Sequence, residues 1–169
     1  MSTLHSASAR LLRQYGEAVG VAPDFHVADA ILQTQIAKEV LATAWNPPDT
    51  RPRQLLEFIS HVKQQGTSGS LIHEDASHDS PFTIHHSHLL DAFQAALARR
   101  NALDFEDLIL RSTELLAHDM VGPQLRSGFS LVLVDEAQDL NNAQYEWLYS
   151  LTRDHQNLTL IGDPDQSIY

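Results

Sequence analysis

Acidic side chains follow two short apolar runs near the end of the sequence. Asp135 and Glu136 come directly after the run 131–134, and Asp163 and Asp165 follow the run "NLTLIG" (157–162). Mg²⁺ takes one or two carboxylates and completes its octahedron with water and phosphate oxygens, and a neighbouring glutamate can take a proton from an attacking water. The residue types therefore favour a Mg²⁺-dependent hydrolytic site. Acidic residues that simply solvate the end of a strand explain "LVLVDE" equally well, because this pattern is short and common.

The elements that position these carboxylates are predicted to form a strand–helix–strand unit. Continuous runs of Leu and β-branched residues over 130–136 and 157–163 are typical of strands covered on both faces, and 141–153 has a helical pattern. Such a unit builds a parallel sheet, in which ligands bind beyond the carboxyl ends of the strands. Two strands do not make a self-sufficient sheet, so we expect this α/β part to be incomplete.

The preceding two-thirds of the chain are predicted to be mostly helical. Apolar residues recur at helical spacing in five segments, and Asp29 is placed to cap the second of them, whose apolar face is predicted to include Ile31. We expect a turn or linker at 46–52 and a polar loop at 66–81. The predicted fold class is therefore α/β and predominantly helical, with helices over 4–15, 31–41, 55–62, 84–100 and 104–117.

Composition and charge exclude several classes of protein. The 169 residues include no cysteine, which excludes disulfides and thiolate metal sites, and no signal-peptide core or bilayer-length apolar run, so we expect a cytoplasmic protein without a membrane segment. The net charge is −11, and residues 101–169 hold 12 acidic and 3 basic side chains. Taken alone, this balance argues against a chain that coats nucleic acid, because phosphate binding draws on lysine and arginine clusters.

The histidines offer a second candidate metal site. His85 and His88 in "HHSH" stand at a spacing of i, i+3 that can hold a metal on a helix, with His73 and His78 nearby. No third ligand is fixed to this pair by the sequence, so a solvated start of a helix is the simpler interpretation. A metal-dependent hydrolase that combines "DEAQD" with the histidines stays open as an alternative.

Four stretches resemble a known family. "LVDEAQDLN" (133–141) and "IGDPDQSIY" (161–169) resemble motifs II and III of superfamily 1 helicases of the UvrD/PcrA/Rep type, with Ala137 in place of an aromatic residue and Pro164 in place of an acidic one. "STLHSASARLLRQYG" (2–16) is similar to the family's "TFHSFAARLLR" segment, with Leu4 in place of Phe. "LDFEDLILRSTELL" (103–116) is similar to the helix that precedes motif II. The four stretches occur in family order along the whole chain.

The resemblance implies roles in nucleotide hydrolysis, with ATP and Mg²⁺ as cofactors. Asp135 is expected to help hold Mg²⁺ on the triphosphate, and Glu136 to orient and deprotonate the attacking water. Gln138 and Asp139 are expected to tie this edge to neighbouring motifs, and Gln166 to sense the γ-phosphate and couple nucleotide state to DNA position. Apart from the resemblance, Gln166 is explained as an ordinary turn residue.

The resemblance also implies contacts with DNA. Tyr169 is expected to stack on a base, a contact worth about 1–3 kcal/mol in single-strand binders. Thr3 and His5 fall in the family's strand-contacting segment, where a hydroxyl and an imidazole can reach phosphate or base. A half-buried aromatic is the simpler interpretation of Tyr169, and a helix N-cap explains Thr3 equally well.

The implied architecture is part of a helicase motor. Residues 1–20 and 121–169 correspond to parts of a RecA-like domain 1A, a P-loop NTPase fold, and 21–120 correspond to a helical 1B-like subdomain. The implied activity is ATP-dependent translocation on single-stranded DNA and unwinding of duplex DNA, in DNA repair or replication.

One element of that motor is not in the sequence. The phosphate-binding loop G-x-x-x-x-G-K-[ST] does not occur in these 169 residues, and in the family it precedes the "TFHS" segment. We therefore expect a fragment that is inactive in isolation and that self-associates through its unpaired strand at 131–134. The alternative is a non-enzymatic helical interaction module derived from a truncated helicase.

Overall fold

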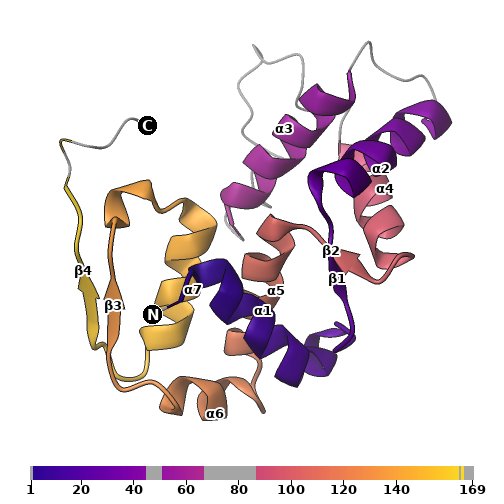
Figure 1. Ribbon diagram of the computed structural model, residues 1–169. Coiled ribbons are helices and arrows are strands. Elements are labelled where there is room, and N and C mark those ends of the chain that lie inside the picture. The colour runs from indigo at the N-terminus through magenta and orange to yellow at the C-terminus, as the bar shows by residue number, and fades with distance from the viewer. Residues whose placement is uncertain (1, 45–50, 67–86, 164, 166–169) are drawn as a thin grey trace. The chain divides into compact units, whose positions relative to one another are not determined.

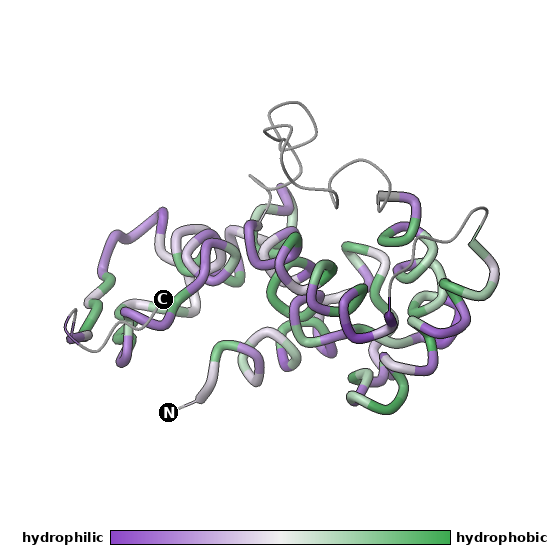
Figure 2. Tube along the Cα trace, turned by 90° about the horizontal axis from the view of Figure 1, so that it is seen from above, coloured by the Kyte–Doolittle hydropathy of each residue, from purple (hydrophilic) through white to green (hydrophobic). Residues whose placement is uncertain are grey.

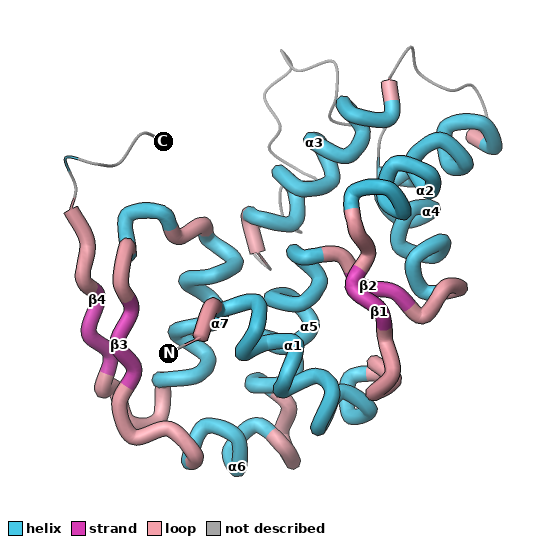
Figure 3. Tube along the Cα trace, viewed as in Figure 1, coloured by secondary structure: helices cyan, strands magenta, loops and turns pink. Residues whose placement is uncertain are grey.

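The computed structural model describes residues 2–44, 51–66, 87–163 and 165. These residues are mostly helical, with two short pairs of parallel strands (Figure 1, Figure 3). They divide into two compact units: the second unit is Asp24–Asp107, and the first unit comprises the described residues before and after it. This mostly helical α/β composition agrees with the predicted fold class. The assignment of segments to RecA-like and 1B-like domains stays a prediction.

The second unit is built around three helices, α2 (Ala30–Thr43), α3 (Pro52–Gln64) and α4 (Ser87–Ala98). As predicted, Asp29 caps α2, because its Oδ1 accepts a hydrogen bond from Leu32 N at 2.8 Å. Helix α2 packs against α3 and α4, and Figure 2 shows hydrophobic and hydrophilic residues alternating along the helical turns. The core of the unit consists of Ala28, Ile36, Ala37, Val40, Leu55, Ile59, Leu89, Phe93, Ala96, Leu97 and Ala102.

The sequence did not predict the strand pair of this unit. Strands β1 (His26–Val27) and β2 (Ala102–Leu103) run parallel, with His26 opposite Ala102 and Val27 opposite Leu103. Two residues are too few to show the alternation by which a strand is recognised in a sequence. The prediction of the apolar face of α2 was wrong at Ile31, which is 70% exposed.

A buried group of charges holds the start of α5 (Phe105–Ala117) against α3. Lys63 pairs with Asp104 and with Asp107, whose Oδ1 lies 2.8 Å from the Lys63 Nζ, and all three side chains are at most 5% exposed. Gln94 Nε2 also donates to Asp107 Oδ1, at 2.9 Å. One ammonium group therefore faces two buried carboxyl groups, and it can neutralise the charge of only one of them.

The two carboxyl groups respond to this arrangement in opposite directions. Burial raises the pKa of Asp104 to about 6, since the loss of hydration and the nearby charge of Asp107 outweigh the attraction of Lys63. Burial acts in the same sense on Asp107, but there the charge of Lys63 and the hydrogen bonds from Lys63, Gln94 and the Asp104 segment outweigh it, so its pKa is lowered. The buried cluster of Lys63, Asp104 and Asp107 therefore takes up one proton, at Asp104, when the pH falls from neutral through about 6.

The first unit comprises α1 (Leu4–Tyr15), η1 (Gly16–Val19), the greater part of α5, and the elements that follow it. These are α6 (Gly122–Ser127), β3 (Val132–Val134), η3 (Ala137–Asp139), α7 (Asn142–Thr152) and β4 (Leu158–Leu160). Trp147 Nε1 donates to Ser112 Oγ at 2.7 Å and thereby links α7 to α5. The buried apolar residues of this unit include Leu12, Leu108, Ile109, Leu115, Leu116, Leu125, Leu148 and Leu151.

Helix α6 was not predicted, and a buried arginine explains why it forms. Arg126 is 4% exposed, hydrogen bonds to Leu116 O at the end of α5, and donates from Nε to Asp154 Oδ2 at 2.5 Å. Gly122 at the start of α6 lies so close to α5 that a Cβ there would be 2.3 Å from Leu116 O. These are tertiary contacts, and a six-residue helix with Gly-Pro at its start shows no clear period in the sequence.

The predicted parallel pairing of the two C-terminal strands is confirmed, with Val132 opposite Leu158 and Val134 opposite Leu160. The prediction that both faces are covered was wrong. Leu133 is 64% exposed, whereas Val132 and Val134 on either side of it are half-buried, so one face of the pair is open to solvent. The strands are also shorter than predicted, with three paired residues each.

The remaining predicted elements agree with the structure where it describes them. Helices α1, α2, α3, α5 and α7 match their predicted segments, and α4 covers the described part of the segment 84–100. The predicted linker at 46–52 and the polar loop at 66–81 lie largely outside the described residues. None of the helices in the described ranges is long and apolar enough to span a bilayer.

The charges around Lys63 predict a pH dependence of folding. A carboxyl group whose pKa is about 6 in the folded chain, above its ordinary 3.8, stabilises the fold fully below pH 3.8 and loses that contribution as the pH rises through about 6. Relative to Asp104→Asn, the wild-type free energy of unfolding should therefore be about 1 kcal/mol higher near pH ~5 than near pH ~7.5. Urea unfolding at both pH values measures this difference. The exposed substitution Asp91→Asn is the control, and a difference of opposite sign would contradict the prediction.

Candidate functional site

The acidic segments that follow β3 and β4 lie at the same edge of the strand pair. Pairing continues past the strands, because Ile161 N donates to Val134 O at 2.8 Å and Ala137 N donates to Ile161 O at 2.9 Å. These two bonds align Asp135 and Glu136 with the segment that leads into Asp163. The carboxylates of all three residues are exposed at the carboxyl ends of the strands, where parallel sheets bind their ligands.

Glu136 has a strained backbone. Its φ of 55° and ψ of 43° are left-handed, a conformation that costs a residue other than glycine about 1–3 kcal/mol and that concentrates at functional sites. This conformation turns the chain sharply out of β3 into η3, where Asp139 N donates to Glu136 O at 3.0 Å. The turn therefore places the Glu136 side chain at the strand end. The sequence did not predict this left-handed backbone conformation.

Gln138 connects the two acidic segments. Its Nε2 donates to Glu136 Oε2 at 2.5 Å, and its Oε1 accepts a hydrogen bond from Asp163 N at 3.1 Å. The reverse orientation of the amide would set its oxygen against a carboxylate, so the two bonds fix one orientation. Gln138 therefore restrains the Glu136 carboxylate and ties it to the backbone that follows β4.

Gly162 makes this connection sterically possible, and sequence reasoning missed it. A Cβ at this position would lie 2.6 Å from Gln138 Oε1 and 3.2 Å from Ala137 N. The approach of the two segments thus leaves room for a side chain at Gly162 only if the Gln138 amide moves away. The only signal in the sequence was a glycine between the apolar run and Asp163.

The carboxylates fit a Mg²⁺ ion that is shared with a phosphate ligand. Asp135 is exposed, and its Oδ1 accepts only the amide of Glu136, at 3.1 Å, among the hydrogen bonds of the described residues. In the described part of the chain, no three His, Asp or Glu side chains are arranged to hold a metal ion by themselves. Mg²⁺ does not need such a cage, since water and phosphate oxygens supply its other ligands.

Of the four histidines considered as metal ligands, His88 alone lies within the described ranges. His88 is exposed on α4, in the second unit, and His73, His78 and His85 lie outside the described residues. The structure therefore assembles no histidine–carboxylate metal group among the residues that it describes.

The predicted DNA-contacting residues are only partly described. Thr3 is the N-cap of α1, where its Oγ1 accepts a hydrogen bond from Ser6 N at 3.2 Å. The interpretation of Thr3 as a helix N-cap is therefore confirmed. His5 is half-buried in the first turn of α1. Gln166 and Tyr169 lie outside the described residues, and their roles stay predictions.

Comparisons with known proteins match the chain over its full length. The family model described as the UvrD/REP helicase N-terminal domain matches residues 1–169. The chain is 35% identical over 174 residues to a protein named ATP-dependent DNA helicase PcrA from Leuconostoc citreum, and 32% identical over 171 residues to one named DNA helicase II from Escherichia coli strain K12. Each alignment covers 100% of this chain and 23% of the relative, so the chain spans about a quarter of the length of these curated relatives.

The contact between Gly162 and Gln138 predicts that Gly162→Ala will separate the two acidic segments. The new methyl group should displace the Gln138 amide and break its bond to Asp163 N, which should raise the hydrogen-exchange rate of that amide several-fold. The free energy of unfolding should change by less than about 1 kcal/mol, because the clash is with the end of a flexible side chain.

NMR-detected exchange on the 169-residue chain measures this effect. Gly128→Ala is the matched control, because a Cβ there meets only Leu125 O, at 3.3 Å. An unchanged Asp163 amide in Gly162→Ala would show that Gln138 does not bridge the segments in solution.

Proposed function

Because the chain belongs to the UvrD/REP helicase N-terminal domain family, as its motifs predicted, we propose that it forms part of an ATP-dependent DNA helicase. Its relatives are named DNA helicases, and the proposed activity is movement along single-stranded DNA and unwinding of duplex DNA, driven by ATP hydrolysis. We place this activity in the cytoplasm, in DNA repair or replication. The proposed partners are single-stranded and duplex DNA.

The observation that carries the proposal is the edge formed by Asp135, Glu136 and Gln138. Asp135 lies at the strand end with an exposed carboxylate, and we assign it to Mg²⁺. When bound, ATP would supply the phosphoryl group, and Mg²⁺ would neutralise the charge that develops on its oxygens. Glu136 is assigned as the group that takes the proton of the attacking water.

The hydrogen bond from Gln138 supports the role of Glu136. Gln138 occupies Glu136 Oε2, and Glu136 Oε1 accepts no hydrogen bond among the described residues. One carboxylate oxygen is thus held in place while the other remains accessible to a water molecule. A fixed base of this kind needs little reorganisation when the proton moves.

The same glutamine offers a route from the nucleotide to the DNA. Gln138 Oε1 binds the backbone of Asp163, three residues before Gln166 and six before Tyr169 in the sequence. We assign Gln166 to the γ-phosphate and Tyr169, with Thr3 and His5, to single-stranded DNA. A shift of Gln138 on hydrolysis would pass directly to the segment that carries Gln166 and Tyr169.

In this proposal residues 1–20 and 121–169 are parts of a RecA-like domain 1A, and residues 21–120 are a helical 1B-like subdomain. The sequence contains no G-x-x-x-x-G-K-[ST] loop, and backbone N–H groups and a lysine of such a loop provide most of the binding of a triphosphate. We therefore propose that the 169-residue chain by itself hydrolyses no ATP.

A second candidate is a non-enzymatic interaction module. It is favoured by the apolar side chains that the strand pair leaves open to solvent, among them Leu131, Leu133 and Ile161, which are 57%, 64% and 54% exposed. Exposed apolar patches of this kind mark surfaces that bind another protein or another part of the same one. This candidate requires no chemistry at Glu136, so substitution of that residue separates the two functions.

The assignment of Glu136 predicts the effect of Glu136→Gln on ATP hydrolysis. We consider a protein in which these 169 residues replace the matching segment of the Leuconostoc citreum relative. Glu136→Gln should lower its DNA-stimulated ATP turnover at least about 100-fold, because a general base contributes about 10²–10⁴-fold. Nucleotide affinity, measured with a fluorescent ATP analogue, should change less than about threefold, because glutamine keeps the shape and the polarity of the side chain.

The control for this experiment is Asp119→Asn, which removes an exposed carboxylate between α5 and α6. It should leave turnover and affinity unchanged. Turnover in Glu136→Gln that equals the unsubstituted protein would refute the role of Glu136 and favour the interaction module. The 169-residue chain alone should show only background hydrolysis in the same assay.

The open face of the strand pair predicts self-association of the isolated chain. Strands with unpaired edges and exposed apolar residues readily pair with a second molecule. Sedimentation velocity should show oligomers that increase with concentration, and Leu133→Lys should reduce them by placing a charge on the open face. Ile31→Lys is the matched control, since Ile31 is equally exposed, at 70%, but lies in the second unit. A chain that is strictly monomeric at all concentrations would contradict this prediction.

A further inference from the structure

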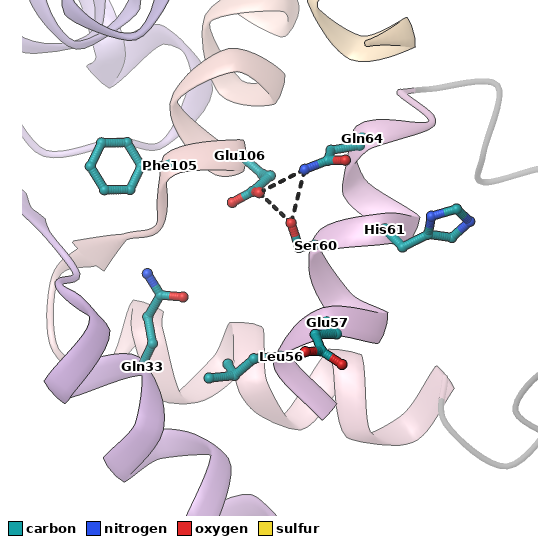
Figure 4. Close-up of a pocket in the computed structure, with 8 residues that line it drawn as sticks. All are labelled: Gln33, Leu56, Glu57, Ser60, His61, Gln64, Phe105 and Glu106. Atoms are coloured by element: carbon teal, nitrogen blue, oxygen red, sulfur yellow. Dashed lines mark hydrogen bonds between the residues drawn. The ribbon is translucent and has the colours of Figure 1, made fainter. Parts of the chain in front are cut away.

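The second unit contains an open pocket of about 550 Å³ that the proposed helicase chemistry does not use. It is bounded by α2, α3 and the start of α5, all within this unit. Figure 4 shows the side chains around it, with Gln33, Leu56, Ser60 and Glu106 around the open space and the His61 ring on the far side of α3. The pocket is therefore formed mainly by polar groups, together with Leu56 and the ring of Phe105.

At one wall of the pocket, a carboxylate is held in place by neutral groups. Ser60 Oγ donates to Glu106 Oε1 at 2.5 Å, and Gln64 Nε2 donates to the same oxygen at 3.3 Å and to Ser60 Oγ at 3.0 Å. A carboxylate has no hydrogen to give, so the hydroxyl must be the donor to it. Glu106 is half-buried and forms no ion pair within the described residues.

Three oxygen atoms of the pocket accept no hydrogen bond from the described residues. The bonds to Ser60 and Glu106 use both N–H groups of Gln64, and Gln33 Nε2 donates to Ala28 O at 2.9 Å, which fixes the orientation of the Gln33 amide. Among the hydrogen bonds of the described residues, none reaches Glu106 Oε2, Gln33 Oε1 or Gln64 Oε1. These three oxygens line one pocket, and a ligand that satisfies them must be a donor with several N–H groups.

The charge of the pocket selects a cation. Its ionised groups are Glu106 and Glu57, and no lysine or arginine lines it. Glu57 already pairs with Arg53 at 2.8 Å on the exposed side of α3, whereas within the described ranges Glu106 is bonded only to the neutral side chains of Ser60 and Gln64. A partly desolvated carboxylate without a cation gains strongly from a charge-assisted hydrogen bond.

The sequence offers the pocket no lysine or arginine of its own. All eleven lysine and arginine residues of the chain lie in its described parts, and none of them lines the pocket. The stretches 45–50, 67–86 and 166–169 contain no basic residue other than histidine. No undescribed stretch of this chain therefore carries a lysine or an arginine that could fill the pocket.

We propose that this pocket binds an arginine side chain of a protein segment from outside these 169 residues. A guanidinium group is planar and carries five N–H donors in a fixed fork, which suits several acceptors in one pocket better than a compact ammonium group does. Phe105, which is 50% exposed, also lines the pocket. Leu56 contacts the aliphatic part of the side chain.

A peptide titration tests the proposal without any assay of ATP or DNA, so its outcome is independent of the proposed helicase activity. The ¹⁵N-labelled 169-residue chain is titrated with the capped peptide acetyl-Ser-Gly-Arg-Gly-Ser-amide at about 150 mM salt, which screens unspecific attraction to a chain of net charge −11. Saturable shifts are expected at the amides of Ser60, Gln64 and Glu106. The matching lysine peptide should bind at least about threefold more weakly.

Substitutions identify the group that binds. Glu106→Gln should raise the Kd of the arginine peptide at least about tenfold, since hydrogen bonds to a charged group are the strong ones. Asp91→Asn, which removes an exposed carboxylate of the same unit, should change it less than about twofold. Gln33→Leu removes one acceptor without touching Glu106, and it should weaken binding about threefold even if Glu106→Gln fails to fold.

Three outcomes would overturn the proposal. The first is the absence of shifts up to about 10 mM peptide. The second is a set of shifts spread over the acidic surface that Asp91→Asn reduces as much as Glu106→Gln does. The third is a change at the pocket amides that depends on protein concentration and not on peptide, which would assign the pocket to contact with a second copy of the chain.

Discussion

The parallel hydrogen bonds between β3 and β4 are the interaction on which the candidate site depends. They bring together two acidic segments that are more than twenty residues apart in the sequence, and they set the register in which Ala137 N reaches Ile161 O. Once this register is fixed, Gln138 can bind Glu136 and the backbone of Asp163 at the same time. The left-handed Glu136 and the crowded Gly162 are consequences of the same close approach.

In the proposed function, the strand pair would supply only part of a catalytic centre. Carboxylates at a strand end can hold a divalent cation and a water molecule, but they repel a triphosphate, whose binding needs N–H groups and positive charge. In that proposal, these 169 residues would provide the acidic half of such an arrangement. The strand pair itself is also covered on one face only. Leu133 is exposed, whereas Val132 and Val134 beside it are half-buried.

The second unit shows how buried charge can both shape a fold and leave a binding site. Lys63 meets two carboxyl groups in the interior, and the imbalance appears as the raised pKa of Asp104 and the lowered pKa of Asp107. Glu106, between these two residues in the sequence, turns instead toward Ser60 and Gln64 and pairs with no cation in the described part of the chain. One short stretch at the start of α5 thus supplies an internal anchor and an acceptor for an external donor.

The sequence by itself determined the longer helices, the parallel pairing of the last two strands and the family of the chain. Asp29 capped its helix as predicted, since capping depends on neighbouring residues alone, and the motifs around Asp135 and Asp163 identified the family because residue types and spacing are local information. Only the tertiary structure decided the left-handed backbone conformation of Glu136, the two hydrogen bonds of the Gln138 amide and the close approach at Gly162. The same is true of helix α6 and the strands β1 and β2. Each of these depends on the approach of residues that are distant in the chain, and the spacing of residue types along a sequence carries no record of that approach.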